Sequence, residues 1–588
     1  MRITKYIFLI LISSLSISAL AQNEKFQVYG AGRFYMQNSE IGGDLYRQTI
    51  INGDTLAADT VNARKEMTGY ALFDLGFQVN PNPSTEIRVL TRVTSDLDGF
   101  WGAGIGFGFR ELYIRGLVKG KVRYRVGDLD LKMTPFTLYN SDADLGQHRM
   151  SSLHVYEDII QYEQFYRNNR WRQQGVQTDF KLRLPGKGNT LGFDMFLAKN
   201  RQTDFFFTPD RLIGGGSMVY GRKGFGEIGY NLVGMFDVAQ TAQFSEEMKA
   251  TTVHTINAKL KPVEDLDLIF YGEGGISMSR YEEINEAPQD TSDVFFQLGV
   301  RRNTEDKLRF YGEYLFVRSG FRSPGAQSRR IVSGSLPQNF SFQGNNEAPR
   351  AFNVFDVLTD VGLYNLTITP ELQPFLPAYN NVSPYGDATP NRQGLRGGID
   401  YGTDSTAIRS IKANLALLTE VNGEGTSEFR NFTRLDLSGR FALNELYGGK
   451  NRLIVELGGR YEATSRDAID APVEALEGIG EVDLTSIFLE AGISFEVTQD
   501  LFLELGVINL NAEGTEYMAM RNAFSEIADY QQLDIDLSDQ TVLAGMKYTF
   551  NQNTHLLIQG RSSTIESADI PRGAYDIQQL VVLFNIFF

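Results

Sequence analysis

Large apolar residues stand at every second position in many segments of this chain, and charged residues fill the positions between them. In "TEIRVLTRVTS", Val89 and Val93 alternate with Arg88 and Arg92. Successive side chains of a β-strand point to opposite faces, so a period of two predicts strands with one apolar and one charged face. The same pattern recurs in "GKVRYRVGD", "KLRFYGEYLF", "TRLDLSGRF" and "RLIVELGGRY".

The lengths and connections of these strands distinguish two kinds of all-β protein. A soluble sandwich also alternates, but its strands are usually about five or six residues long. Here the alternation often continues for about ten residues, with charges in the middle of the segment. Short connections rich in Gly, Asn, Asp and Pro, such as 80–85 and 551–553, alternate with long ones such as 129–173 and 319–391. This layout is typical of an antiparallel transmembrane β-barrel.

The first residues predict export from the cytoplasm. Arg2 and Lys5 precede an apolar stretch that ends in the A-x-A pattern Ala19-Leu20-Ala21. This is the anatomy of a secretory signal peptide. We therefore expect a signal peptide over residues 1–21 and a mature chain over residues 22–588. No apolar run long enough for a transmembrane helix follows it.

Composition narrows the class further. The chain contains no cysteine, which excludes a disulfide-stapled secreted scaffold and lipidation on cysteine. The net charge of −16 argues against a nucleic-acid partner, because phosphate binding needs an excess of Lys and Arg. A large exported chain without cysteine fits a bacterial envelope.

With these features the chain resembles bacterial outer-membrane β-barrels of the porin-like class. The resemblance covers nearly all of the mature chain, and its sharpest element is the ending "LVVLFNIFF", where Leu580, Val582, Phe584, Ile586 and Phe588 share one face. The resemblance implies an outer-membrane location, with this face against lipid. It also implies that Phe584, Ile586 and Phe588 are read by the barrel-assembly machinery as an assembly signal.

The turns predict the size of the barrel. Pairing tight turns with long loops gives about 22 strands, and about 18–22 if some segments belong to loops. The region 392–420 is the least clear, because "QGLRGGIDYG" and "SIKANLALLTEV" form either a strand pair or part of a loop. The first strand, Phe26–Gln37, begins close behind the expected cleavage site. This spacing leaves no room for an N-terminal plug domain such as TonB-dependent transporters carry.

Two long loops could fold into so wide a barrel. Residues 319–391 hold an apolar segment, Phe352–Leu366, in which Val354, Val357, Leu358 and Val361 could line one helix face. Residues 140–173 are rich in aromatic residues and arginine. Each loop either constricts the pore from inside or packs as an extracellular cap on its neighbours, and the sequence leaves both alternatives open.

Charged residues on the non-lipid face are predicted to line the lumen, since each would cost roughly 2–4 kcal/mol against the middle of the bilayer. Two interpretations remain open. Rings of basic side chains can select anions, whereas cross-strand ion pairs only stiffen the wall. The predicted lumen-lining residues are Arg88, Arg92, Arg115, Arg123, Arg125, Arg309, Glu313, Arg434, Asp436, Glu456 and Arg460.

No catalytic, metal-binding or cofactor-binding pattern stands out. His148 and His154 lie near several carboxylates in one loop, but their spacing fits no strong metal motif. The glycines of 102–109 precede no helix, so they do not predict a nucleotide site. We therefore expect no enzyme activity, no catalytic residues, no metal site and no cofactor.

The expected function is passive diffusion of small polar or anionic solutes through an outer-membrane channel. The alternative, from a different class, is a structural or assembly scaffold whose barrel docks partner proteins. Outer-membrane lipid, the assembly machinery and small polar solutes are the expected partners. The pattern does not determine the solute or the oligomeric state.

Overall fold

The computed structural model describes residues 25–588 apart from short internal gaps. The predicted signal peptide, its cleavage site and the question of an N-terminal plug therefore lie outside the described residues. The gaps are 43–44, 52–53, 62–63, 98–103, 143–148, 187, 246, 262–266, 284–286, 303–307, 332–337, 343–345, 351–352, 404–405, 424–426, 470–478, 522–526 and 568–573.

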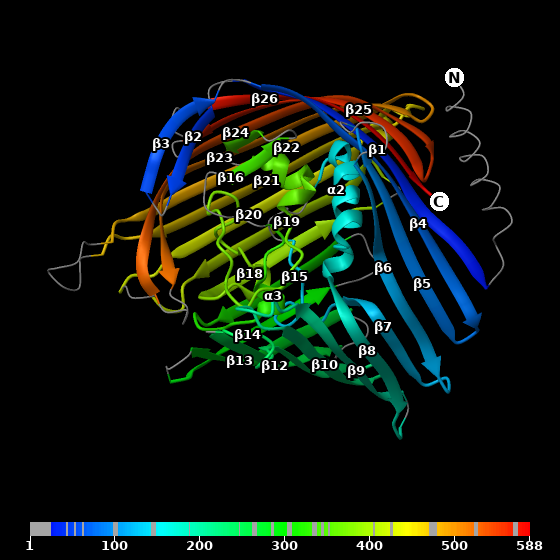
Figure 1. The fold of residues 1–588 in the computed structure, drawn as a ribbon, viewed down its shortest axis with the longest axis vertical. Helices are drawn as coiled ribbons and strands as arrows, with labels where there is room; N and C mark the ends of the chain where they lie inside the picture. The colour runs from blue at the N-terminus through cyan, green and yellow to red at the C-terminus, as the bar shows by residue number, and fades with distance from the viewer. Residues whose placement is uncertain are drawn as a thin grey trace.

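The chain forms one closed antiparallel barrel of 22 strands (Figure 1). The barrel closes because the first strand, β1, pairs on one side with β4 and on the other with the last strand, β26. The barrel strands are β1 (Phe26–Gly42), β4 (Arg64–Asn82), β5 (Thr85–Asp96), β6 (Ile105–Val118), β7 (Val122–Leu131), β8 (Trp171–Arg183), β9 (Asn189–Arg201), β10 (Arg211–Arg222), β11 (Gly226–Asp237), β12 (Glu247–Leu260), β13 (Leu268–Glu283), β14 (Gln289–Arg302), β15 (Leu308–Val317), β18 (Arg392–Tyr401), β19 (Ile408–Thr419), β20 (Asn431–Ala442), β21 (Leu453–Arg466), β22 (Val482–Thr498), β23 (Leu501–Arg521), β24 (Ile527–Asn551), β25 (Thr554–Ser567) and β26 (Ala574–Phe587).

Most connections at one end of the barrel are short, and the longest connections, such as 132–170 and 318–391, all lie at the other end. The start of β1 and the end of β26 lie at the short-turn end, together with turns such as 83–84 and 552–553. The region 392–420 forms the strand pair β18–β19, with Ile399 opposite Ala413. The strand number therefore lies at the upper end of the predicted range.

The long connections carry the remaining elements. They comprise the hairpins β2 (Leu45–Ile51) with β3 (Asp54–Val61) and β16 (Gln338–Phe342) with β17 (Asn346–Arg350), and the helices α2 (Ser151–Gln164), η2 (Arg167–Asn169), α3 (Pro324–Gln327), α4 (Val354–Thr359), η4 (Val361–Leu363) and η5 (Gly386–Ala388); α5 (Asn444–Tyr447) lies in the turn between β20 and β21. No helix in the described ranges is both long and apolar enough to cross a membrane.

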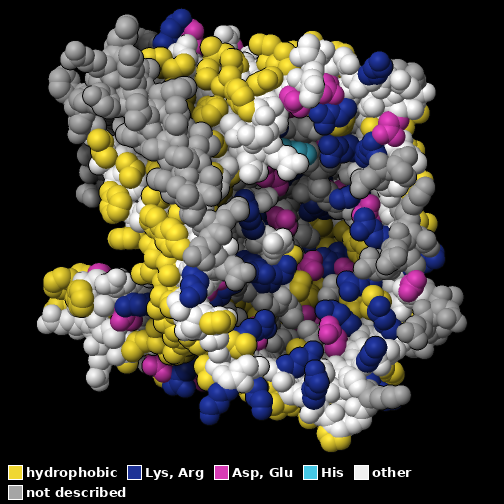
Figure 2. All heavy atoms as spheres, turned by 90° about the vertical axis from the view of Figure 1, so that its right-hand side faces the viewer, with side chains coloured by type: hydrophobic (Ala, Val, Ile, Leu, Met, Phe, Trp, Pro, Cys, Tyr) yellow, Lys and Arg dark blue, Asp and Glu magenta, His cyan; other side chains and the backbone are white. Residues whose placement is uncertain are grey.

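The outer face of the wall is apolar. Val93, Leu437 and Leu580 expose 40%, 51% and 49% of their surface, and each of their sequence neighbours on the other face is charged, polar or buried. Figure 2 views the molecule from the short-turn end and shows hydrophobic side chains massed along one flank of the barrel. A continuous apolar exterior is stable against lipid but not against water. Because the barrel is also closed, every wall strand has a hydrogen-bonding neighbour on both sides. The predicted all-β transmembrane barrel is confirmed.

The main apolar core lies inside the barrel. It joins Leu153, Tyr156 and Ile159 of α2 and Phe355 of α4 to the inner face of the wall strands. Wall residues such as Ile508, Leu510, Leu543, Leu557, Val581 and Leu583 are at most 1% exposed beneath these loops. Part of the lumen is thus a packed interior, and water does not fill it throughout.

Candidate solute pathway

Both long loops that were candidates for folding inward pack on the inner wall. The loop between β7 and β8 carries α2, and the loop between β15 and β18 carries α3 and α4 (Figure 1). Met150 shows how far the first loop reaches, because a Cβ atom added to Gly492 would meet its side chain at 3.0 Å. Gly492 lies near the middle of β22, seven residues before the short turn at 499–500. The loop therefore descends well below the long-loop rim of the barrel.

Wall carboxylates hold the N-termini of both inward helices. The Ser151 N–H at the start of α2 donates to Glu456 Oε2 of β21 at 2.5 Å. The Val354 N–H at the start of α4 donates to Asp539 Oδ2 of β24 at 2.5 Å. The first N–H groups of a helix have no partner within the helix, and a carboxylate both accepts their hydrogen bond and complements the helix dipole.

The C-terminal end of α2 is held by a second cluster of wall residues. Glu163 accepts hydrogen bonds from Arg33 of β1, at 2.6 Å, and from Arg92 of β5. Asp74 of β4 accepts from Arg92 at 2.7 Å, from Arg110 of β6 at 3.0 Å and from the Tyr162 hydroxyl at 2.5 Å. We call these six residues the α2 latch. Three guanidinium groups balance two carboxylates and bind backbone carbonyls as well, because Arg110 donates to the carbonyl oxygens of α2 residues 162 and 163.

The latch also sets the acidity of Glu163. Burial alone raises the pKa of this carboxyl, but the hydrogen bond from Arg92 and the positive charges of Arg33 and Arg110 outweigh burial and lower the pKa below its ordinary value. Glu163 is therefore ionised at neutral pH and keeps its ion pairs.

The second inward loop has its own anchors. Asn381 donates through its side chain to Glu516 at 2.7 Å and through its backbone to Glu462 at 3.1 Å. Asp387 pairs with Arg396 of β18 at 2.7 Å. The two loops also bind each other, since the Tyr139 backbone N–H of the first loop donates to the Gly325 carbonyl of the second at 2.8 Å. The interior is one connected assembly of loops and wall.

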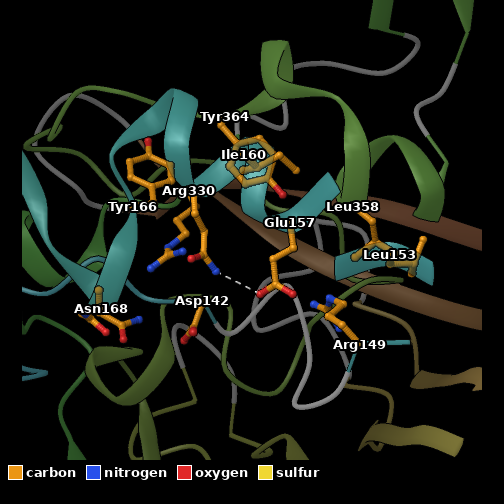
Figure 3. A pocket seen from close by; sticks show the side chains of 12 residues that line it. Asp142, Arg149, Leu153, Glu157, Ile160, Tyr166, Asn168, Arg330, Leu358 and Tyr364 are labelled. Carbon is orange, nitrogen blue, oxygen red and sulfur yellow. Dashed lines mark hydrogen bonds between the residues drawn. The ribbon is translucent and has the colours of Figure 1, made fainter. Parts of the chain in front are cut away.

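A small cavity of about 70 Å³ lies between the two loops. Figure 3 shows α2 contributing Leu153, Glu157 and Ile160 on one side, with Arg330, Leu358 and Tyr364 of the other loop facing them. Its mixed lining and small volume suit a few water molecules better than a solute.

A larger vestibule of about 990 Å³ opens at the short-turn end, between β4 and β9. Figure 2 shows this end of the barrel hollowed and lined by dark-blue and magenta side chains. Its charged lining consists of Lys25, Arg115, Arg123, Arg125, Lys132 and Arg170 on the basic side, and Glu86, Asp130, Asp179 and Asp194 on the acidic side. Basic side chains outnumber acidic ones there.

A second cavity of about 490 Å³ lies against β12 to β15 and β18. Both inward loops reach it, through Thr134 of the first and Asp387 of the second. The two cavities are bounded by neighbouring residues of the first loop, Lys132 and Met133. Both cavities have polar and charged linings inside the barrel.

The charged side chains predicted to line the lumen all take part in ion pairs. The pairs are Arg88–Glu111 (3.3 Å), Arg92–Asp74 (2.7 Å), Arg115–Glu86 (2.8 Å), Arg123–Asp179 (2.5 Å), Arg125–Asp130 (3.2 Å), Arg309–Asp400 (2.9 Å), Glu313–Arg396 (2.6 Å), Arg434–Asp436 (2.7 Å), Glu456–Arg440 (3.3 Å) and Arg460–Glu462 (4.0 Å). Carboxylates therefore compensate the arginines locally, and these arginines are not a row of free positive charges.

The residues of the predicted assembly signal lie on the outer face of the last strand. The Phe588 ring stacks on Phe73 of β4 with centroids 5.8 Å apart, and its backbone exchanges hydrogen bonds with Gly30 of β1. Phe584 packs edge-on against Phe550 at 6.1 Å. Ile586 lies directly across from Gly32 in the pairing of β26 with β1.

The histidines make no constellation within the described part of the chain. His154 contacts the Arg149 carbonyl at 2.9 Å, and His254 contacts the Tyr230 hydroxyl at 2.7 Å, on a different part of the barrel. His148 lies outside the described residues. No group of three or more His, Cys, Asp or Glu side chains in the described ranges is arranged to hold a metal ion.

Sequence reasoning missed Arg110, one of the three cations of the latch. The pairing of β5 with β6 shifts register between Leu90 and Thr91, so Arg110 lies in a β-bulge. A bulge inserts one residue and reverses the faces of the strand beyond it. The sequence contains a sign of this bulge. The exposed apolar residues occupy odd positions at Phe107 and Phe109 and even positions at Leu112 and Ile114. Alternation that changes phase in this way marks a bulge.

Comparisons with known proteins add resemblances of fold only. No protein-family model and no curated protein matches the chain. Among solved structures, the chain is similar to OpdQ of Pseudomonas aeruginosa, with 10% identity, 95% of this chain and 98% of that chain covered, and a TM-score of 0.31. A BenF-like porin of Pseudomonas fluorescens Pf-5 shows 9% identity, coverages of 96% and 99%, and a TM-score of 0.33. The ferric citrate transporter FecA shows 10% identity, coverages of 95% and 78%, and a TM-score of 0.44.

The geometry of this chain itself defines its class. A closed barrel with an even number of antiparallel strands, an apolar exterior, short turns at one end and long loops at the other is the architecture of bacterial outer-membrane proteins. The protein is an outer-membrane β-barrel of porin-like form, and its own loops occupy part of its lumen.

Proposed function

We propose that the protein is an outer-membrane channel through which small polar solutes diffuse, along a route narrowed by its two inward loops. The observation that carries the proposal is the vestibule of about 990 Å³ inside a closed wall, lined mainly by charged and polar side chains. A volume of this size belongs to the range in which proteins hold small molecules. A barrel built only as a scaffold has no need of a hydrated interior chamber.

The charge of the vestibule favours small anionic solutes. Three of its cations, Lys25, Lys132 and Arg170, form no ion pair within the described residues, whereas Glu86, Asp130 and Asp179 are paired with arginine. Charged rings in a narrow aqueous space raise the local concentration of ions of opposite sign. The expected preference is therefore moderate and comes from these three cations.

Conductance of the purified protein in planar bilayers tests both statements. We expect steady open-channel current and a reversal potential shifted toward the anion in a salt gradient. The triple change Lys25→Gln, Lys132→Gln and Arg170→Gln should move the reversal potential toward the cation, while Lys65→Gln at the long-loop end should not. Absence of current overturns the channel and, if partner proteins co-purify, favours the docking scaffold.

We also propose that the outer face of β26 is the assembly signal and that residues 1–21 are a cleaved signal peptide. The position of Phe588 against Phe73 supports the first, because its ring completes the exterior where the last strand meets the first. Phe588→Ala should lower the yield of assembled barrel in cells while leaving refolding into detergent intact. Mass spectrometry of the exported chain should give a first residue of Gln22.

A further inference from the structure

The cavity of about 490 Å³ is notable for how its charges are paired. Six charged side chains line it: Lys259, Glu273, Arg301, Glu313, Asp387 and Arg396. Arg396 pairs with both Glu313 and Asp387, at 2.6 and 2.7 Å. Lys259 pairs with Glu227 at 3.2 Å. Glu273 and Arg301 take part in no ion pair within the described residues.

Glu273 is a carboxyl group with little contact with water and no ion-pair partner among the described residues. It is 8% exposed, and the Thr134 hydroxyl donates to it at 2.6 Å. A buried carboxylate is costly unless a positive charge or several hydrogen bonds stabilise it. Thr134 comes from the first inward loop, so the loop supplies this carboxyl group with a hydrogen-bond donor but with no positive charge.

Arg301 is the matching cation on the next strand. Its guanidinium carbon lies 5.4 Å from the centre of the Tyr271 ring. Gly299 makes room for that ring, because a Cβ atom added there would meet Tyr271 at 2.6 Å. The Tyr271 hydroxyl donates to Glu313 at 2.7 Å, which fixes the ring. Arg301 is thus held on an aromatic surface, with its charge open to the cavity.

The spacing of the two charges is set by strand register. Arg301 lies opposite Ile269, and Glu273 lies opposite Gln297. Tyr271 is the position midway between Ile269 and Glu273 on the same face, and its Cα atom is about 7 Å along the strand from that of Glu273. The Arg301 guanidinium group lies beside the Tyr271 ring, and it forms no ion pair with Glu273. A chain of two amino acids at about 3.5 Å per residue spans the same interval.

We propose that this cavity is a binding site for a short zwitterionic peptide of about two residues, with Arg301 taking the carboxylate and Glu273 taking the ammonium group. The inference rests on the proposed channel and names a solute class for it. Both ends of such a ligand meet a charge that the wall leaves uncompensated, and the Tyr271 ring provides an apolar surface between them. Solutes that carry only one of the two charges gain half of these contacts.

Binding is best measured by ligand-observed NMR titration of the full barrel in detergent, with Ala-Ala as the probe. N-acetyl-Ala-Ala lacks the ammonium group, and Ala-Ala-amide lacks the carboxylate. We expect each capped peptide to bind about tenfold more weakly than Ala-Ala, since a charge-assisted hydrogen bond contributes an effect of this order. Equal affinity for all three peptides overturns the proposal.

Variants assign each end of the peptide. In Arg301→Gln, Ala-Ala should bind as weakly as Ala-Ala-amide binds to the unchanged protein, and amidation should cause no further loss. In Glu273→Gln, the same should hold for acetylation. Arg309→Gln is the matched control, because this arginine lies on neighbouring β15, pairs with Asp400 and does not line the cavity. Loss of binding in the control to the same extent also overturns the assignment.

Bilayer current measured on the same preparations separates the two proposals. Selective peptide binding without current supports the peptide site and contradicts the proposed channel. Current without selective binding supports the channel and contradicts the peptide site.

Discussion

At the scale of single residues, the lumen holds many charged groups in ion pairs that are partly or fully shielded from water. Arg33 is 2% exposed and Asp74 is fully buried, yet both belong to the α2 latch. Removing one member of a buried pair costs more than the pair itself contributes, because the remaining charge stays buried without a partner. The latch should therefore respond strongly to a single neutral substitution.

Glu163→Gln tests this response. The change leaves Arg33, Arg92 and Arg110 with one carboxylate, Asp74, so the C-terminal end of α2 should detach from the wall part of the time. We expect larger and noisier single-channel current and a lower thermal unfolding temperature. Glu513→Gln, on an exposed outer position of β23, is the control. Identical traces for both variants would show that the latch does not hold α2.

Acid should release the same contact. Because the folded state lowers the pKa of Glu163, its ion pairs stabilise the docked helix above the ordinary value of 4.5, and this contribution disappears as the pH falls through the lowered pKa. Conductance should thus be constant from neutral pH down to about 4.5 and rise below it. Asp74 titrates in the same cluster, so Glu163→Gln should reduce the acid step rather than abolish it. An undiminished step in that variant would assign it to another group.

The prediction of which residues face the lumen depended on strict alternation of apolar and charged residues along each strand. Alternation placed Arg88 and Arg92 on one face and Val89 and Val93 on the other, and the structure keeps both sets apart. It could not supply the partners of these arginines, because both lie on neighbouring strands. Asp74 lies opposite Arg92 in the pairing of β4 with β5, and Glu111 lies next to the bulge at Arg110 in β6. Which charged side chains form an ion pair depends on the register between two strands, and the sequence of one strand alone does not determine that register.

At the scale of elements, the sequence predicted the wall strands but not whether the two long loops fold into the barrel. A wall strand has one face against lipid, which forces a period of two over its whole length. An inward loop meets apolar wall residues on one side and polar cavities on another, so its sequence resembles that of an extracellular cap. Val354, Val357, Leu358 and Val361 were predicted to line one helix face. The helix α4 buries the first three, but it ends at Thr359, and Val361 begins η4 and is only half-buried. The pattern does not show whether the helix packs on the inner wall of the barrel or on other extracellular loops.

Replacing residues 150–165 by a flexible Gly-Ser linker of equal length tests the role of α2. The substitution removes Leu153, Tyr156 and Ile159 from the apolar core and leaves the wall strands unchanged. We expect open-channel conductance to rise several-fold, because a wide lumen loses its largest internal obstruction. The matched control replaces loop 202–210, whose Phe205, Phe206 and Phe207 are exposed and take no part in that core. If conductance is unaltered by loss of α2, the solute route does not pass this helix.

At the scale of the whole molecule, one part of the barrel interior is a packed apolar core and another part is a charged, open cavity. Beneath α2, inner-face residues such as Val581 and Leu583 form an apolar core, whereas the faces of β4 to β9 near the short turns border a charged vestibule. Alternation predicted a polar lumen throughout, since it treats every non-lipid position alike. "LVVLFNIFF" departs from that rule, and its second apolar face is explained by the helix packed against it.

The vestibule makes selectivity a long-range electrostatic effect, and salt should reveal it. The cavity of about 990 Å³ is about 10 Å across if compact, which matches the Debye length at about 0.1 M salt and exceeds the length of about 3 Å at 1 M. The three cations without ion pairs can therefore influence passing ions in dilute salt but not in concentrated salt. We expect the anion-directed reversal potential to be clear near 0.1 M KCl and nearly absent near 1 M, with little change in the number of open channels. If anion selectivity persists at 1 M, the ions are selected by direct contact with side chains of the inward loops and not by the charges of the open vestibule.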